Sequence, residues 1–480
     1  MPFVSTLEPD AQLAVARELW RQSRVSEAEA ALRGVLESLP PREDAGMLLA
    51  EVLRSQGRLG AASEMLRELC RANGFEPGLS LRAAQFVRHC DRHRIASEIC
   101  EGALVRHATP PAELLALAGH IARESGDFET ARARYLAALD AGIDPERNHV
   151  LSALANTRRY SDAADPDLGR CEAHFRNTTY SARSRASAGF GLAKIRSDLG
   201  DFPSAARVLR EANAMVQRVQ RWDGRAWHRL VEARMRDRVV PADSSADGKF
   251  VPVFVVGVPR SGTTLTASLL ARATGARDRG EFRAMRFIAD QLIAGRHLEN
   301  RGAITEAANL YRTLAVQDDE PSNWYLDQDP LNFRWLQIAA AMFPQARVIR
   351  LRRDPRDTAL SLWCQDFAHA DLAFAYDFDD IADFMDGEAA LLRYWQHNLR
   401  VPIFELDYES LVTEPETTLA ALRAFIGAPP REPGAVDADA PVQSASVWQA
   451  RQPVYTTSIG RWLRYAAYVP ELSRFAPREE

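Results

Sequence analysis

The sequence predicts a multidomain protein in which an all-α domain of helical repeats is followed by an α/β domain with a parallel sheet. Segments of the first half recur with a period of 34 residues, and a stretch rich in Pro, Ser and Asp lies between Asp237 and Lys249. After this stretch, short apolar runs alternate with helical stretches. We therefore expect helical repeats over residues 1–240 and the α/β domain over residues 241–480.

The composition is that of a globular protein, with 480 residues, 46% hydrophobic and 26% charged, and a formal net charge of −5. Such a balance offers no bulk attraction to nucleic acid or to an anionic membrane. The five cysteines form no CxxC pair, and the first residues lack the apolar core of a signal peptide, so we expect a cytoplasmic protein without a zinc site. Only two of the 60 Lys and Arg residues are lysine, so a fixed positive charge in a site must come mainly from arginine.

The repeat is clearest where the segment that starts at Gly57 is aligned with the one that starts at Asp91, because Ala-Ser-Glu recurs at Ala62 and Ala96. Segments at Tyr160 and Phe202 look like degenerate later copies. A 34-residue period with a turn, an apolar residue and then Ala resembles the tetratricopeptide repeat, in which helix pairs stack into a superhelix. An irregular helical bundle is the alternative.

The α/β region is predicted from its alternating pattern. The expected strands are VPVFVVG, NWYLD, ARVIRL and PIFEL, and the expected helices start near Thr263, Asn332 and Pro355.

The first of these strands leads into a loop typical of phosphate binding. Gly257 and Gly262 have four residues between them, and a helix follows, so backbone N–H groups and the helix N-terminus point at one place. The position at which an NTPase carries its lysine is Thr263, and the charge lies on Arg260 instead. A kinase or NTPase is therefore disfavoured, and an ordinary strand-turn-helix is the structural alternative.

The sequence PRSGTT in this loop resembles the 5′-phosphosulfate loop of sulfotransferases that use 3′-phosphoadenosine 5′-phosphosulfate (PAPS). Arg353 and Ser361, eight residues apart across a strand-to-helix turn, are similar to the 3′-phosphate motif of the same family. The resemblance covers roughly residues 250–465 and is strongest to the tyrosylprotein sulfotransferase branch and to bacterial tetratricopeptide-sulfotransferase fusions. It implies PAPS as co-substrate and no metal.

The resemblance implies a role for each matching residue. The PAPS-binding residues are Arg260, Ser261, Gly262, Thr263, Thr264, Arg353, Ser361, Tyr408, Ser446 and Arg461. Arg260 also stabilises charge on the departing phosphate oxygen. A structural alternative remains for Tyr408, which is equally compatible with a core aromatic.

Glu281 is the expected catalytic base, because Gly280-Glu281-Phe282-Arg283 is similar to the Gly-Glu segment of the tyrosylprotein branch. Arg283 matches a substrate-binding arginine there. We expect nearby arginines to keep Glu281 ionised until proton transfer. The alternative is a surface glutamate paired with arginine. His297 and His369 are expected to face solvent.

Gln328 departs from the family pattern, which has a lysine at this position after the third strand. We expect Gln328 to be a substrate-binding residue that donates a neutral hydrogen bond, with roughly half the strength of a charge-assisted one.

The leading hypothesis is a PAPS-dependent sulfotransferase that modifies a hydroxyl acceptor, a peptide or protein tyrosine presented by the repeat domain. One alternative is a sulfotransferase for a carbohydrate, lipid or small phenol, with repeats that form a homodimer. The other is a nucleotide-binding pseudoenzyme or scaffold whose repeats recruit a protein partner, which Gln328 favours.

Overall fold

The computed structural model describes residues 8–37, 41–144, 146, 148–243, 249–367, 369–429 and 456–475. The chain divides into two compact units. One comprises Met1–Asp144 and Thr313–Pro321, and the other comprises Pro145–Arg312 and Ser322–Glu480.

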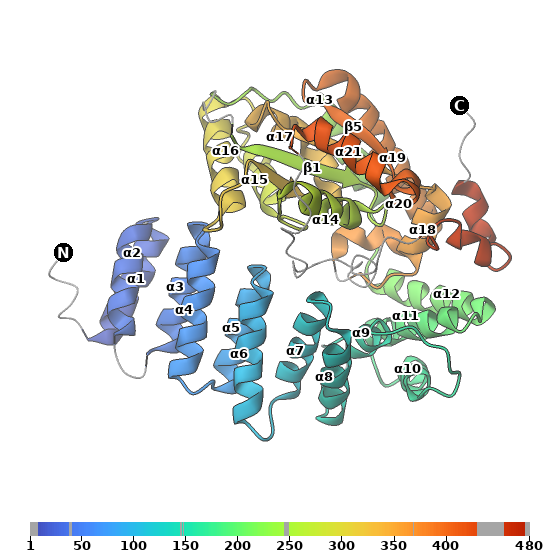
Figure 1. Cartoon of the computed structure of the whole chain (residues 1–480), viewed down its shortest axis with the longest axis horizontal. Helices are drawn as coiled ribbons and strands as arrows, with labels where there is room; N and C mark the ends of the chain where they lie inside the picture. The colour runs from blue at the N-terminus through green and yellow to red at the C-terminus, as the bar shows by residue number, and fades with distance from the viewer. Residues whose placement is uncertain are drawn as a thin grey trace. The chain divides into compact units, whose positions relative to one another are not determined.

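The described part of the first unit contains pairs of helices that stand side by side (Figure 1). The pairs are α1 (Pro9–Arg21) with α2 (Val25–Leu36), α3 (Glu43–Ser55) with α4 (Leu59–Ala72), α5 (Pro77–His89) with α6 (His93–Arg106), and α7 (Ala112–Glu124) with α8 (Phe128–Asp140). The first helices of three pairs begin at residues 9, 43 and 77, and their second helices begin at residues 25, 59 and 93. The predicted 34-residue period is therefore a period of helix pairs.

Small residues at the repeated positions let the helices approach closely. Ala62 and Ala96 are fully buried, together with the larger Leu66 and Ile99 one turn further on. These side chains belong to one continuous apolar core that runs from α1 to α7. Each pair thus covers an apolar face of its neighbour, as expected of stacked repeats.

The segment Thr313–Pro321 is held in the first unit by its acidic residues. The Asp318 carboxylate accepts hydrogen bonds from the backbone N–H groups of Gly60 and Ala61, at 2.7 and 2.8 Å. These groups belong to the first turn of α4, whose N–H groups have no partner within the helix. Arg92 forms an ion pair with Asp319 at 2.7 Å.

Further helices precede the sheet in the second unit: α9 (Val150–Ala155), α10 (Pro166–Arg176), α11 (Ala182–Asp198), α12 (Phe202–Val219) and α13 (Gly224–Arg236). Phe202 begins a helix, as the pattern predicted. The prediction was wrong at Tyr160, which lies in an irregular segment where its hydroxyl donates to Asp167 at 2.8 Å. The helix starts later, at Pro166, because the Asp165 side chain caps it there.

The sheet has the order β2-β3-β1-β4-β5, and all of its pairings are parallel. Its strands are β1 (Val251–Gly257), β2 (Arg277–Asp278), β3 (Trp324–Asp327), β4 (Arg347–Arg352) and β5 (Ile403–Asp407). The central strand β1 is apolar on both faces, which is typical of a parallel sheet covered by helices. Four strands lie where the sequence predicted them; the two-residue edge strand β2 was not predicted, because it is too short to show a pattern.

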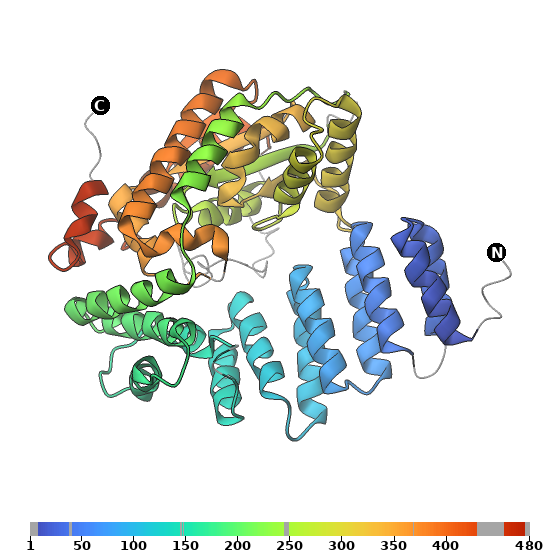
Figure 2. The same cartoon turned by 180° about the vertical axis from the view of Figure 1, so that it is seen from behind.

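Helices cover both faces of the sheet (Figures 1 and 2). Val253 and Val255 of β1 pack in one apolar cluster with residues of α14 and α21. Phe254 points to the other face, where its ring centroid lies 6.0 Å from that of Tyr311. The helices of this region are α14 (Thr263–Thr274), α15 (Ala284–Ala294), α16 (Arg301–Val316), α17 (Leu336–Met342), α18 (Pro355–Trp363), α19 (Phe378–Asn398), α20 (Tyr408–Thr413) and α21 (Pro415–Ile426), with 3₁₀ turns η1 (Pro330–Trp335), η2 (Ala370–Tyr376), η3 (Arg461–Arg464) and η4 (Pro470–Phe475).

The helix predicted from Asn332 starts later than expected. A 3₁₀ turn, η1, occupies residues 330–335, and α17 begins only at Leu336. The Asp329 side chain caps the 3₁₀ turn by accepting a hydrogen bond from the N–H of Leu331 at 3.0 Å. In the described ranges, no helix combines the length and apolar character that a membrane span needs.

Candidate nucleotide and acceptor site

The two predicted phosphate-binding motifs begin at the ends of neighbouring strands. Strands β1 and β4 pair in parallel, with Gly257 opposite Leu351. A helix follows each strand, α14 after β1 and α18 after β4. Because parallel strands end at the same edge of a sheet, the loops that start both helices lie next to each other.

The first loop has a tightly constrained backbone. Gly262 has φ +115°, and a Cβ atom there would lie 2.5 Å from Cδ2 of Tyr408. Arg260 also has a positive φ, +75°, which is uncommon for a residue with a side chain. The Ser261 hydroxyl is buried and has no hydrogen-bond partner among the described residues. Buried polar atoms of this kind call for an explanation, and a ligand oxygen supplies one.

Thr263 and Thr264 form the first turn of α14, and both are buried. The backbone N–H groups at a helix start have no partner within the helix, and they carry the positive end of its dipole. The Ser261 N–H donates to the backbone oxygen of Val258 at 3.1 Å. A loop followed by a helix start is the arrangement at which anions bind, and binding of an anion by Ser261 to Thr264 stays a prediction.

Direct hydrogen bonds connect the two motifs. Nε of Arg260 donates to Oγ of Ser361 at 3.1 Å. Nη1 of Arg353 donates to the backbone oxygen of Arg260 at 3.0 Å. The structure thus brings together three residues that lie up to 101 positions apart in the sequence.

Tyr408 lies against this cluster and is buried. The guanidinium of Arg353 lies 4.6 Å from the centroid of its ring, and its hydroxyl is 2.7 Å from Oγ of Ser458. Arg353 donates with its other nitrogen, Nη2, to the backbone oxygen of Ser458 at 2.9 Å. Tyr408 therefore packs against both motifs, so the core and pocket interpretations of this residue are not exclusive.

Two further predicted residues have different outcomes. Arg461 lies near Cys364: burial raises the pKa of that thiol, and the charges of Arg461 and Arg260 oppose the increase. The charges of both arginines therefore reach the Cys364 thiol, at the C-terminal end of α18. Ser446 lies outside the described residues.

The Glu281 side chain is exposed, and neighbouring protein groups partly desolvate its carboxylate. This partial desolvation raises the pKa of Glu281 to about 7, and the negative charge of Asp329 adds to the increase. Arg283 and Arg260 act in the opposite direction. The expectation that the arginines keep Glu281 firmly ionised is therefore wrong, because desolvation and Asp329 outweigh them.

Arg283 is exposed, and its Nη2 donates to Nε2 of His369 at 2.7 Å. Partial desolvation lowers the pKa of His369, and the charge of Arg283 lowers it further, which favours the neutral imidazole as acceptor. His369 is exposed, as expected. Arg283 and Glu281 interact electrostatically, which places the predicted acceptor-side residues together.

Gln328 follows β3 and is buried. Its Nε2 lies 3.4 and 3.5 Å from the two carboxylate oxygens of Asp278, and its Oε1 has no hydrogen-bond partner among the described residues.

Sequence reasoning missed Asp278, Asp329 and Ser458. Asp329 follows Gln328 directly, so its position near the site could have been inferred from that of Gln328. Asp278 precedes Gly280 by two residues, a spacing typical of an aspartate that accepts the backbone N–H two positions further on. Nothing in the sequence around Ser458 points to its contact with Tyr408.

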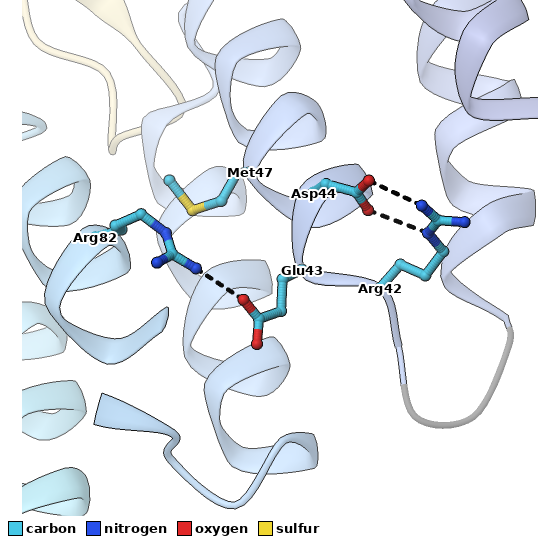
Figure 3. A pocket seen from close by; sticks show the side chains of 5 residues that line it. All are labelled: Arg42, Glu43, Asp44, Met47 and Arg82. Carbon is cyan, nitrogen blue, oxygen red and sulfur yellow. Dashed lines mark hydrogen bonds and ion pairs between the residues drawn. The ribbon is translucent and has the colours of Figure 1, made fainter. Parts of the chain in front are cut away.

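A pocket of about 640 Å³ lies elsewhere, in the first unit, and is lined by Arg42, Glu43, Asp44, Met47 and Arg82. Its charged side chains pair with one another, Arg42 with Asp44 and Arg82 with Glu43 (Figure 3). No group of three or more His, Cys, Asp or Glu side chains suited to hold a metal ion occurs in the part of the chain that the structure describes.

The parallel sheet, with a helix after β1 and another after β4, defines an α/β domain in which the two predicted phosphate motifs adjoin. Residues 252–432 match the model of the sulfotransferase family, so the chain carries a sulfotransferase family domain. An uncharacterized protein of Aquifex aeolicus (strain VF5) is 26% identical to this chain over an alignment 522 positions long. The alignment covers 95% of this chain and 68% of that protein. Protein-tyrosine sulfotransferase 1 of Danio rerio is 25% identical over 199 residues, 37% of this chain and about half (53%) of that protein.

Proposed function

We propose that this protein transfers a sulfuryl group from PAPS to a hydroxyl acceptor, a tyrosine of a peptide or protein. The observation that carries the proposal is the pair of hydrogen bonds that join Arg260 to Ser361 and Arg353 to Arg260, because they unite two phosphate motifs at adjacent strand ends. The match to the sulfotransferase family supports the reaction class, and the similarity to a protein-tyrosine sulfotransferase supports the acceptor.

The residues present fit a nucleotide with two phosphate groups. The buried Oγ of Ser261 and Nε of Arg353 have no hydrogen-bond partner among the described residues, and each belongs to one motif. Arg260, Ser261, Thr263 and Thr264 would hold the 5′ side, and Arg353 and Ser361 the 3′-phosphate. Tyr408 and Arg461 would border the nucleotide, with Ser446 proposed from the resemblance alone. PAPS supplies the sulfuryl group that is transferred.

Around this donor site, different residues of the chain would have different roles in the transfer. Arg260 and the N–H groups of the loop would stabilise the negative charge that grows on the departing phosphate oxygen. Glu281 would accept the proton of the acceptor hydroxyl, and its raised pKa suits a general base near neutral pH. Arg283 would orient the acceptor, and Gln328 would donate a neutral hydrogen bond from its amide.

The helical repeats, which we propose to be tetratricopeptide-like and to extend over residues 1–240, would present the acceptor to the sulfotransferase domain over residues 241–480. The 34-residue spacing of the helix pairs supports this assignment. A cytoplasmic location is supported by the cysteines, all five of which are free.

The test is transfer of radiolabelled sulfate from PAPS to a tyrosine-containing peptide library, with Glu281→Gln as the matched control. We expect labelled peptides with the wild-type protein and none with Glu281→Gln, although both bind the nucleotide. Nucleotide binding without transfer by the wild-type protein would instead support a scaffold. Gln328 is the residue that favours that alternative, because the loss of one charged donor typically costs on the order of 100–1000-fold in rate.

A further inference from the structure

Asp278 contacts two parts of the candidate site at once. Its Oδ1 accepts a hydrogen bond from the backbone N–H of Gly280 at 2.9 Å, and Gly280 has φ +65°. This tight turn leads directly into Glu281. The same carboxylate receives the amide of Gln328, whose Nε2 lies 3.4 Å from Oδ1 and 3.5 Å from Oδ2.

The backbone that follows Asp278 is hydrogen-bonded to β3 and to the residue after it. The N–H of Arg279 donates to the backbone oxygen of Leu326 at 2.9 Å. The N–H of Gln328 donates to the backbone oxygen of Gly280 at 3.0 Å. Gly280 and Gln328 therefore face each other across the two strand ends, which holds the backbone after Asp278 beside Gln328.

The pairing of Asp278 with Gln328 leaves one polar atom of the Gln328 amide without a hydrogen bond in the described part of the chain. Gln328 is 3% exposed, and its Oε1 has no hydrogen-bond partner among the described residues. An amide group that is held at its nitrogen has its oxygen, and therefore its plane, fixed as well. Burial raises the pKa of Asp278 to about 6, while the Gly280 N–H, Gln328 and Arg279 oppose the increase, so the contacts to Gly280 and Gln328 favour the ionised carboxylate.

We propose that Asp278 is a positioning residue of the sulfotransferase site, and that it orients both the Gly280–Glu281 turn and the Gln328 carboxamide. The kinetic part of this inference rests on the proposed function. The contact between Asp278 and residue 328 does not, and it can be tested without any transfer reaction.

The kinetic test compares Asp278→Ala, which loses both contacts, with Asp278→Asn, which keeps an acceptor oxygen for Gly280. We expect Asp278→Ala to lower kcat by about 10-fold or more, with little change in the nucleotide Kd. Asp278→Asn should recover much of this loss, which a general loss of stability would not explain. Wild-type kcat in Asp278→Ala would overturn the proposal.

The second test is a double-mutant cycle on thermal unfolding, with Asp278→Asn, Gln328→Lys and the two combined. A lysine at position 328 lies beside the Asp278 carboxylate in one background and beside a neutral amide in the other. Gln328→Lys should lower the unfolding midpoint more in the Asp278→Asn background than in the wild-type background. We expect the difference between the two effects to be about 3 °C or more. Additive effects would overturn the contact, and a coupled cycle without any sulfate transfer would disprove the proposed function alone.

Discussion

At the scale of single residues, the pKa of the candidate base Glu281 depends on surroundings that motif matching does not reveal. Desolvation raises the pKa of Glu281, the charge of Asp329 raises it further, and Arg283 and Arg260 lower it. The protonation state of a carboxylate in a site thus depends on the sum of these effects, and the sign differs from what the arginine-rich sequence indicates.

This balance predicts the pH dependence of transfer. Glu281 must lose its proton to act as a base, so kcat/KM should rise as the pH increases through about 7, the raised pKa of Glu281. Replacing Asp329 by Asn removes a like charge, lowers that pKa and should move the rise toward lower pH. A pH–rate profile of both proteins measures the shift. A profile that stays in place in Asp329→Asn would contradict the electrostatic account.

At the scale of elements, much of the fold follows from the sequence. The strands β1, β3, β4 and β5 were predicted because buried parallel strands are continuous apolar runs, and the helix starts at Thr263 and Pro355 were predicted because each follows a strand and a turn. The contacts of Asp278 and Ser458 could not be predicted. Each depends on the pairing of segments about 50 residues apart, such as Asp278 with Gln328 and Tyr408 with Ser458.

The loop after β1 makes a specific demand on Gly262. Replacing it by Ala should lower the unfolding midpoint and weaken nucleotide binding, because φ is +115° and a Cβ atom would lie 2.5 Å from the ring of Tyr408. The expected cost is more than about 1 kcal/mol. Gly169→Ala in α10 is the matched control, since nothing lies within 4 Å of its added Cβ, and a helical Ala should be neutral or stabilising. Unchanged nucleotide binding in Gly262→Ala would contradict the role of this loop.

At the scale of the whole molecule, two kinds of periodic order are combined in one chain. The 34-residue helix pairs were readable because equivalent residues recur, and the α/β domain was readable because strands and helices alternate. In the candidate site, the phosphate motifs could be predicted because each is local in sequence. The surroundings of Glu281 could not, because they are assembled from β2, β3 and the segments after them.

The central claim is that the motifs after β1 and β4 bind one nucleotide with phosphates at both the 5′ and 3′ positions. Its most direct test is calorimetric binding of 3′-phosphoadenosine 5′-phosphate, 5′-AMP and ATP with magnesium to the wild-type protein and Arg353→Ala. The account predicts that 3′-phosphoadenosine 5′-phosphate binds most tightly, stabilises the fold by about 2.7 kcal/mol at one hundred times its Kd, and loses its advantage over 5′-AMP in Arg353→Ala. Equal binding of 5′-AMP to the wild-type protein, or tighter binding of ATP with magnesium, would contradict it.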